Sequence, residues 1–117
     1  MRIALAVAVF LPCGAALAQN TSVRGSGIGI ATCGMLLEAK IEDDKAFRSR
    51  LAQWATGYAT GLNVAMGAEK SRNLQDFVPE VADSMVIAAC RQAKKPETSV
   101  LEIVTDLFKR LPPYTGR

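Results

Sequence analysis

The feature that most constrains the fold is a stretch over residues 44–66 in which apolar side chains recur every three or four positions. The residues that share this spacing are Phe47, Leu51, Trp54, Ala55, Tyr58, Leu62 and Ala65. The spacing matches the 3.6-residue period of an α-helix with one apolar face, and it lacks the alternation of a β-strand. The pattern predicts a long helix that buries one side against the rest of the chain.

Two glycines, Gly57 and Gly61, lie within this stretch and are four residues apart. Residues at this spacing share one side of a helix, so both missing side chains fall on the same part of its surface. Each glycine costs about 1 kcal/mol relative to alanine in a helix, which predicts a compensating contact. We expect close packing of another helix there, and a notch that faces a ligand is the alternative.

Residues 1–18 have the features of a secretory signal peptide. Arg2 supplies a positive charge, residues 3–11 form an apolar core, and residues 16–18 match an A-x-A cleavage site. The apolar run is too short to span a bilayer. We expect export to the periplasm and cleavage after Ala18, without a membrane anchor.

Cys13 raises the alternative of a lipoprotein, but Pro12 precedes it where a small residue is expected. Cleavage after Ala18 would leave two cysteines, Cys33 and Cys90, in an oxidising compartment. A zinc site would need four Cys or His ligands in a chain that has no histidine, and a redox pair usually has the spacing C-x-x-C. We therefore favour a structural disulfide over these two alternatives, and a loop of this length contributes about 4 kcal/mol in the chain-entropy model.

Three shorter helices accompany the long one. The first, over residues 28–38, carries Cys33. The acidic residues Glu42, Asp43 and Asp44 suit the start of the long helix, where carboxylates cap the helix and complement its dipole. A calcium loop would instead need spaced oxygen ligands around a central glycine, which this run lacks.

Asn73 is the expected N-cap of the segment that follows residues 68–73. The third helix is expected over residues 80–93. Pro79 either lies in the first turn of this helix or separates a short turn from it. The residues expected to face the core are Val81, Met85, Ala88 and Ala89, with Cys90 near the end of the helix.

The fourth helix begins at Thr98 or Ser99, where Ser99 and Glu102 form a capping box. Its expected buried stripe is Val100, Leu101, Val104, Leu107, Phe108 and Leu111. No segment alternates like a strand, so we predict an all-α protein, a small four-helix bundle with one structural disulfide. The expected division is a flexible leader over 19–29, a helical domain over 30–112 and a frayed tail over 113–117.

The charge is too balanced for a nucleic-acid-binding protein. Without residues 1–18 the chain has 13 Lys and Arg against 11 Asp and Glu, a net charge of +2, and the two signs are interspersed. The one local cluster, Arg91, Lys94 and Lys95, favours a solvated helix C-terminus.

The residue inventory argues against an enzyme. The absence of histidine removes Ser-His and Cys-His bases, and the two cysteines are expected to pair with each other. Gly25, Gly27 and Gly29 follow no strand, so they do not form a phosphate-binding loop. We expect no catalytic residue, no metal site and no cofactor.

Three motifs resemble the HdeA/HdeB family of small periplasmic acid-stress proteins across residues 32–111. They are Thr32-Cys33-x-x-Leu36-Leu37, then Gly57-Tyr58-Ala59-x-Gly61-Leu62-Asn63, and Cys90 followed by Pro96 and an amphipathic helix. The resemblance implies a four-helix protein in which Cys33 pairs with Cys90. It also implies homodimers at neutral pH, opening in acid, and ATP-independent binding of unfolding proteins.

The Gly-Tyr-x-x-Gly motif, a later proline and a terminal amphipathic helix are also similar to the Rap1a/Tai immunity family. That resemblance implies a periplasmic protein that binds and neutralises one specific toxin. Members usually have further cysteines, including one near the end, where this chain has Pro112 and Pro113.

The first resemblance suggests which residues bind clients. At a pH of about 2, protonation of the carboxylates would raise the net charge of residues 19–117 from +2 to +13, and self-repulsion would loosen the bundle. The apolar face of the long helix would then become available. The residues that we expect to bind clients or partners are Phe47, Leu51, Trp54, Tyr58 and Leu62.

Overall fold

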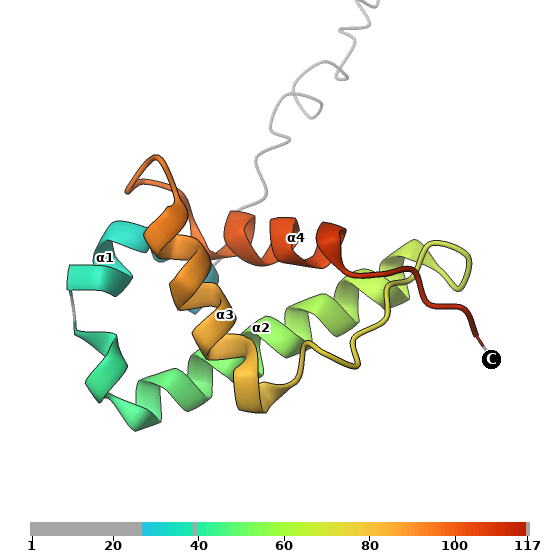
Figure 1. Ribbon diagram of the computed structural model, residues 1–117, viewed down its shortest axis with the longest axis horizontal. Helices are drawn as coiled ribbons and strands as arrows, with labels where there is room; N and C mark the ends of the chain where they lie inside the picture. Colours follow the sequence, from blue (N-terminus) through green and yellow to red (C-terminus); the bar gives the residue numbers. More distant parts are fainter. Residues whose placement is uncertain (1–26, 39, 117) are drawn as a thin grey trace, which may run out of the picture.

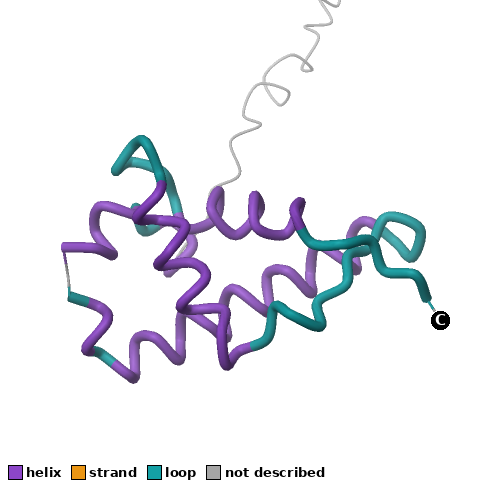
Figure 2. Tube along the Cα trace, viewed as in Figure 1, coloured by secondary structure: helices purple, strands orange, loops and turns teal. Residues whose placement is uncertain are grey.

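A computed structural model of the protein describes residues 27–38 and 40–116. Within these residues the chain forms four α-helices and no β-strand, which confirms the predicted all-α class (Figures 1 and 2). The expected signal peptide over 1–18, Cys13, and residues 19–26 of the expected leader lie outside the described residues. No helix in the described part is long and apolar enough to cross a membrane.

The helices are of unequal length, and α2 is the longest of them. Along the chain they are the 3-10 helix η1 (Gly27–Ile30), α1 (Cys33–Glu38), the 3-10 helix η2 (Ile41–Asp43), α2 (Lys45–Met66), α3 (Pro79–Gln92) and α4 (Val100–Arg110). In Figure 1, α3 lies across α2, and α4 runs beside them toward the far end of α2. The most extensive helix–helix contact is between α2 and α3.

Both ends of α2 are fixed by the residues that the sequence suggests. The Asp44 side chain accepts a hydrogen bond of 3.0 Å from the Phe47 N–H and caps the first turn. Gly67 ends the helix with a φ of 81°, a positive value that favours glycine. The predicted position of this helix is confirmed.

The start of α3 agrees with one of the two alternatives for Pro79, which is its first residue. Asn73 is not its N-cap, because Val78 precedes the helix. The Asn73 side chain instead accepts a hydrogen bond of 2.9 Å from the Gln75 N–H, which closes a local turn.

The predicted core face of α3 is partly wrong. Val81 and Ala88 are exposed, while Met85 and Ala89 are half-buried at the edge of the core. The buried residues are Ala82, Val86, Ile87 and Cys90. The disulfide explains this rotation: Cys90 must face α1, so Val86 and Ala82, four and eight residues earlier, face inward with it.

The capping box that starts α4 is confirmed. Ser99 Oγ accepts a hydrogen bond of 3.1 Å from the Glu102 N–H, and Glu102 Oε2 accepts one of 2.8 Å from the Ser99 N–H. In the predicted stripe, Val100, Val104, Phe108 and Leu111 are buried, and Leu101 and Leu107 are half-buried. Ile103, which the stripe omitted, is also buried.

The expected first helix over 28–38 is two separate elements. Between η1 and α1, the Ala31 carbonyl accepts a hydrogen bond of 2.8 Å from the Val100 N–H, and Thr32 forms a β-bridge with Ser99. Because the backbone at 31 and 32 bonds to the start of α4, it cannot continue the helix. The expected leader is also too long, since Gly29 is buried within η1.

The expected frayed tail is wrong for its first two residues. Pro113 forms a β-bridge with Arg72, and the Tyr114 N–H donates a hydrogen bond of 3.0 Å to the Ser71 carbonyl. Just before them, the Pro112 carbonyl accepts one of 2.8 Å from the Asn73 N–H. The chain end is therefore paired with the loop that joins α2 to α3.

The predicted close packing at Gly57 and Gly61 is wrong. A Cβ atom at either position would meet nothing within 4 Å among the described residues, and both glycines are on the exposed side of α2. The close approaches are at Gly29 and Gly34 instead. A Cβ at Gly29 would lie 2.5 Å from Trp54 Cζ2, and one at Gly34 would lie 3.2 Å from the Pro96 carbonyl oxygen.

We therefore predict opposite effects for two glycine-to-alanine substitutions. Gly29→Ala should lower the free energy of unfolding by about 1–3 kcal/mol, because the added methyl group overlaps the Trp54 ring. Gly57→Ala, the matched control, should raise it by up to about 1 kcal/mol through helix propensity. Urea unfolding of both variants measures the difference, and equal effects would contradict the packing described here.

Candidate functional site

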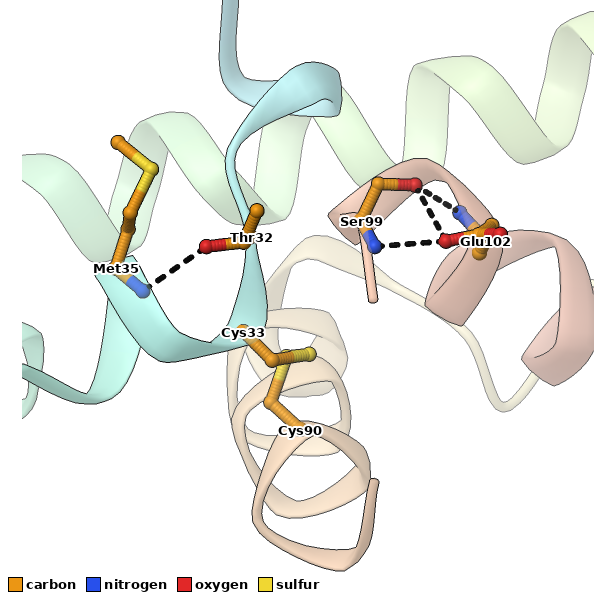
Figure 3. Close-up of a disulfide and its surroundings, with 6 residues drawn as sticks. All are labelled: Thr32, Cys33, Met35, Cys90, Ser99 and Glu102. Atoms are coloured by element: carbon orange, nitrogen blue, oxygen red, sulfur yellow. Dashed lines mark hydrogen bonds between the residues drawn. A yellow bond between two sulfur atoms is a disulfide. The ribbon is translucent and has the colours of Figure 1, made fainter. Parts of the chain in front are cut away.

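The Cys33–Cys90 disulfide joins α1 to α3 in the interior (Figure 3). The two Cα atoms are 5.0 Å apart, and both cysteines are buried. The predicted disulfide is confirmed.

Backbone hydrogen bonds extend this cross-link to the start of α4. The Cys33 N–H donates to the Thr98 carbonyl at 2.8 Å, and the Gly34 N–H donates to the Pro96 carbonyl at 2.9 Å. At the start of α1, Thr32 Oγ1 accepts a hydrogen bond of 3.2 Å from the Met35 N–H (Figure 3). We call α1, α3 and residues 96–100 the cross-linked unit, because one covalent bond and several backbone bonds join them.

The apolar face of α2 packs against the rest of the molecule. Leu51 is fully buried, with an exposed fraction of 0%. The other four residues predicted to bind clients or partners are half-buried and pack against the core: Phe47, Trp54, Tyr58 and Leu62. The five residues thus belong to one covered face, and Leu51 is inaccessible in the folded protein.

Trp54 and Tyr58 form the aromatic centre of this face. Their rings stack with centroids 5.3 Å apart and planes 4° from parallel. The Tyr58 and Thr105 hydroxyls are 3.0 Å apart, and Thr105 Oγ1 donates its proton to the Leu101 carbonyl at 2.7 Å. Tyr58 is therefore the donor to Thr105, and this bond joins α2 to α4.

A partly buried ion pair joins the first turn of α2 to α3. Arg48 Nε lies 2.6 Å from Asp83 Oδ2, and Arg48 Nη2 donates a hydrogen bond of 2.9 Å to Ser84 Oγ. The side chains of Arg48 and Asp83 are 30% and 14% exposed. Solvent therefore weakens the attraction between the two charges less than it would in a fully exposed pair.

The other end of α2 is held by the side-chain amide of Asn63. Its Nδ2 donates to the Arg72 carbonyl at 2.8 Å, and its Oδ1 accepts from the Arg72 N–H at 2.7 Å. The Arg72 side chain in turn donates to the Leu111 carbonyl at 3.0 Å. Polar contacts therefore fix both ends of α2, and apolar packing covers its middle.

Arg48, Asp83 and Ser84 were not among the site residues predicted from the sequence. Arg48 follows Phe47 of the apolar stripe of α2, and Asp83 follows the buried Ala82 of α3, so opposite charges beside two apolar stripes are a usable signal. That signal becomes specific only when it is known that α2 and α3 are neighbours. Among the described residues, no group of three or more His, Cys, Asp or Glu side chains is placed to hold a metal ion.

Comparison with known proteins adds no relative: the chain matches no protein-family model, no curated protein and no solved structure.

The Glu102 carboxylate has a pKa below its ordinary value. The main cause is the hydrogen bond from the Ser99 N–H, and the Ser99 hydroxyl contributes a second bond of 3.1 Å. Because the folded-state pKa is lower than the unfolded one, the stabilisation is present above the unfolded pKa. It is lost as the pH falls through the folded pKa.

We predict that Glu102→Gln lowers the free energy of unfolding at neutral pH, because the amide accepts the Ser99 N–H more weakly than the carboxylate does. The difference from the wild type should shrink and vanish as the pH falls through the carboxyl range. Urea unfolding across that range measures it. The control is Glu97→Gln, since Glu97 has no side-chain hydrogen bond in the described part, and a pH-independent effect of Glu102→Gln would contradict the argument.

Proposed function

We propose that the protein is an exported, ATP-independent holdase that opens in acid and binds unfolding proteins through the apolar face of α2. The observation that carries the proposal is the position of the disulfide: it joins α1 to α3, and no disulfide joins α2 to either of them. Loss of packing around α2 would therefore uncover apolar surface while the cross-linked unit stays together.

Acid weakens the cap of α4, one of the two helices that cover α2. The Glu102 carboxylate, whose pKa is lowered by the hydrogen bonds from Ser99, caps the start of α4. Its protonation weakens that cap, and α4 packs against α2 through the Tyr58–Thr105 contact. The other covering helix, α3, is joined to α2 by the Arg48–Asp83 ion pair.

Net charge acts in the same direction. After removal of residues 1–18, full protonation of the carboxylates takes the net charge from +2 to +13. Repulsion among these cations opposes the compact state, and the disulfide limits how far the chain can expand. The high positive charge would also keep a complex with an aggregating protein in solution.

The uncovered surface has the composition of a general apolar binding face. Trp54 and Tyr58 provide stacked aromatic rings, and Phe47, Leu51 and Leu62 extend the apolar stripe along the helix. Such a face recognises no particular sequence and suits many unfolded partners.

The first test is light scattering of an aggregating client protein with the oxidised protein, made without residues 1–18. We expect suppression at a pH of about 2–3, where most carboxyl groups are protonated, and none at neutral pH. Replacing both Trp54 and Leu62 by alanine should weaken the suppression several-fold. The matched control is Val64→Ala on the same helix, because Val64 is 79% exposed and contributes nothing to the covered face.

The disulfide provides the second arm of this experiment. Cys33→Ser together with Cys90→Ser should abolish suppression, because the acid-opened chain loses its cross-link. If that variant suppressed aggregation in acid as well as the wild type does, the disulfide would not be needed for holdase activity. Absence of suppression by the wild-type protein at either pH would refute the holdase proposal.

Asp83→Asn removes the ion pair between α2 and α3. We expect it to lower the free energy of unfolding at neutral pH by roughly 1 kcal/mol, because the charge that faces Arg48 is lost. Urea unfolding followed by Trp54 fluorescence measures the change. Asp76→Asn, in an exposed turn, is the control, and equal stability of Asp83→Asn and the wild type would show that the ion pair does not hold α2 against α3.

A second candidate function, neutralisation of one specific toxin, is favoured by apolar surface that is exposed in the folded state. Val64 and Tyr114 are 79% and 56% exposed beside a hollow of about 410 Å³, which Leu74 and Asn73 also line. An inhibitor needs such anchor side chains on a stable face at neutral pH. A protein with this function should not suppress aggregation in the light-scattering test, either in acid or at neutral pH.

A further inference from the structure

A hollow of about 370 Å³ lies between the end of α3 and the exposed side of α4. Its floor is apolar, with Ile103 buried and Ala89 and Ala93 half-buried. Its rim carries Lys94, Lys95 and Arg110, and we call these six residues the basic hollow. The volume is within the range of known ligand sites, about 300–1,000 Å³.

The basic hollow has an excess of positive charge. Lys94, Lys95 and Arg110 form no ion pair with any described residue. Asp106 is the one carboxylate among the lining residues, so cations outnumber anions there by three to one. The basic cluster noted in the sequence is also divided, because Arg91 faces a different hollow beside Ile87. Lys94 and Lys95 thus act together with Arg110 rather than with Arg91.

The backbone that carries the two lysines is held in place. The Thr98 N–H donates to the Lys95 carbonyl at 3.1 Å, and the Pro96 and Thr98 carbonyls accept bonds from Gly34 and Cys33. Cys33 is itself joined to Cys90, one turn before Lys94. The loop between α3 and α4, at the top of Figure 1, is therefore pre-organised, which reduces the entropy cost of binding.

The cations lie toward opposite ends of α4. Lys94 and Lys95 are in the loop that precedes its first residue, Val100, and Arg110 is its last residue, about 15 Å from Val100 along the helix axis. A single small anion cannot neutralise both ends of this distribution. An extended segment with several carboxylates can, and an aliphatic side chain between them would cover Ile103.

We propose that the basic hollow binds an acidic segment of another protein that also carries aliphatic side chains. Charge complementarity selects the carboxylates, and the apolar floor selects the aliphatic groups. This site belongs to the folded protein at neutral pH. It is independent of the holdase proposal, which concerns the covered face of α2 after opening in acid.

The test is fluorescence anisotropy at neutral pH with a labelled synthetic peptide of alternating glutamate and leucine. We expect saturable binding that weakens as salt is added. Lys94→Gln combined with Lys95→Gln should weaken it about tenfold, and Arg110→Gln several-fold, because each removes exposed charge contacts. The matched control is Lys109→Gln, an exposed cation of α4 outside the hollow, which should change the affinity little.

Two further probes separate the alternatives. A peptide of alternating lysine and leucine should not bind, and a glutamate peptide without leucine should bind more weakly. Competition by inorganic phosphate or by vesicles of anionic lipid at comparable concentration would overturn the proposal in favour of those ligands. Absence of binding, or an equal loss for Lys109→Gln and the double lysine variant, would also overturn it.

Discussion

The bond between Cys33 and Cys90 is the constraint on which the rest of the structure depends. It fixes which side of α3 faces inward, because Val86 and Ala82 must follow Cys90 toward α1. It also places α1 against residues 96–98, whose carbonyls accept hydrogen bonds from Cys33 and Gly34. The bend before α4 is thereby fixed, and α4 starts at the capping box of Ser99. A helix of six residues is not stable alone, so α1 depends on this cross-link for its stability.

Features set by neighbouring residues could be predicted from the sequence. Asp44 and Gly67 delimit α2, and Ser99 with Glu102 starts α4, because caps depend on residues within one turn. Features set by distant contacts could not. The helix-propensity cost of Gly57 and Gly61 suggested that another helix crosses there. The position that has no room for a side chain is instead Gly29, which contacts Trp54 of α2. The candidate site followed the same division: the stripe on α2 was visible, whereas the Arg48–Asp83 pair required knowledge of which helices are neighbours.

The two proposed surfaces use different physical properties of one small bundle. The apolar face of α2 is covered in the folded protein. Polar contacts hold its ends at Arg48 and Asn63, and the Tyr58–Thr105 hydrogen bond joins its middle to α4. The basic hollow is open, and its loop of Lys94 and Lys95 lies between α3 and residues 96–100 of the cross-linked unit, whereas Ile103 and Arg110 lie on α4. Conditions that loosen α2 should therefore leave the loop of Lys94 and Lys95 largely in place. A small helical bundle with one disulfide can in this way contain one part that opens and one part that does not.

The pairing of the chain end with the loop after α2 has a consequence for the order of folding. Pro112 and Tyr114 bond to Asn73 and Ser71, and these contacts form only after residues 112–114 have been synthesised. In a chain that grows from its N-terminus, Cys33 and Cys90 can pair before α4 is available, since both cysteines precede it. The far end of α2 then stays unpaired until residues 112–114 are made. During that interval the nascent protein would expose the apolar stripe of α2, and its own biogenesis would require protection from aggregation.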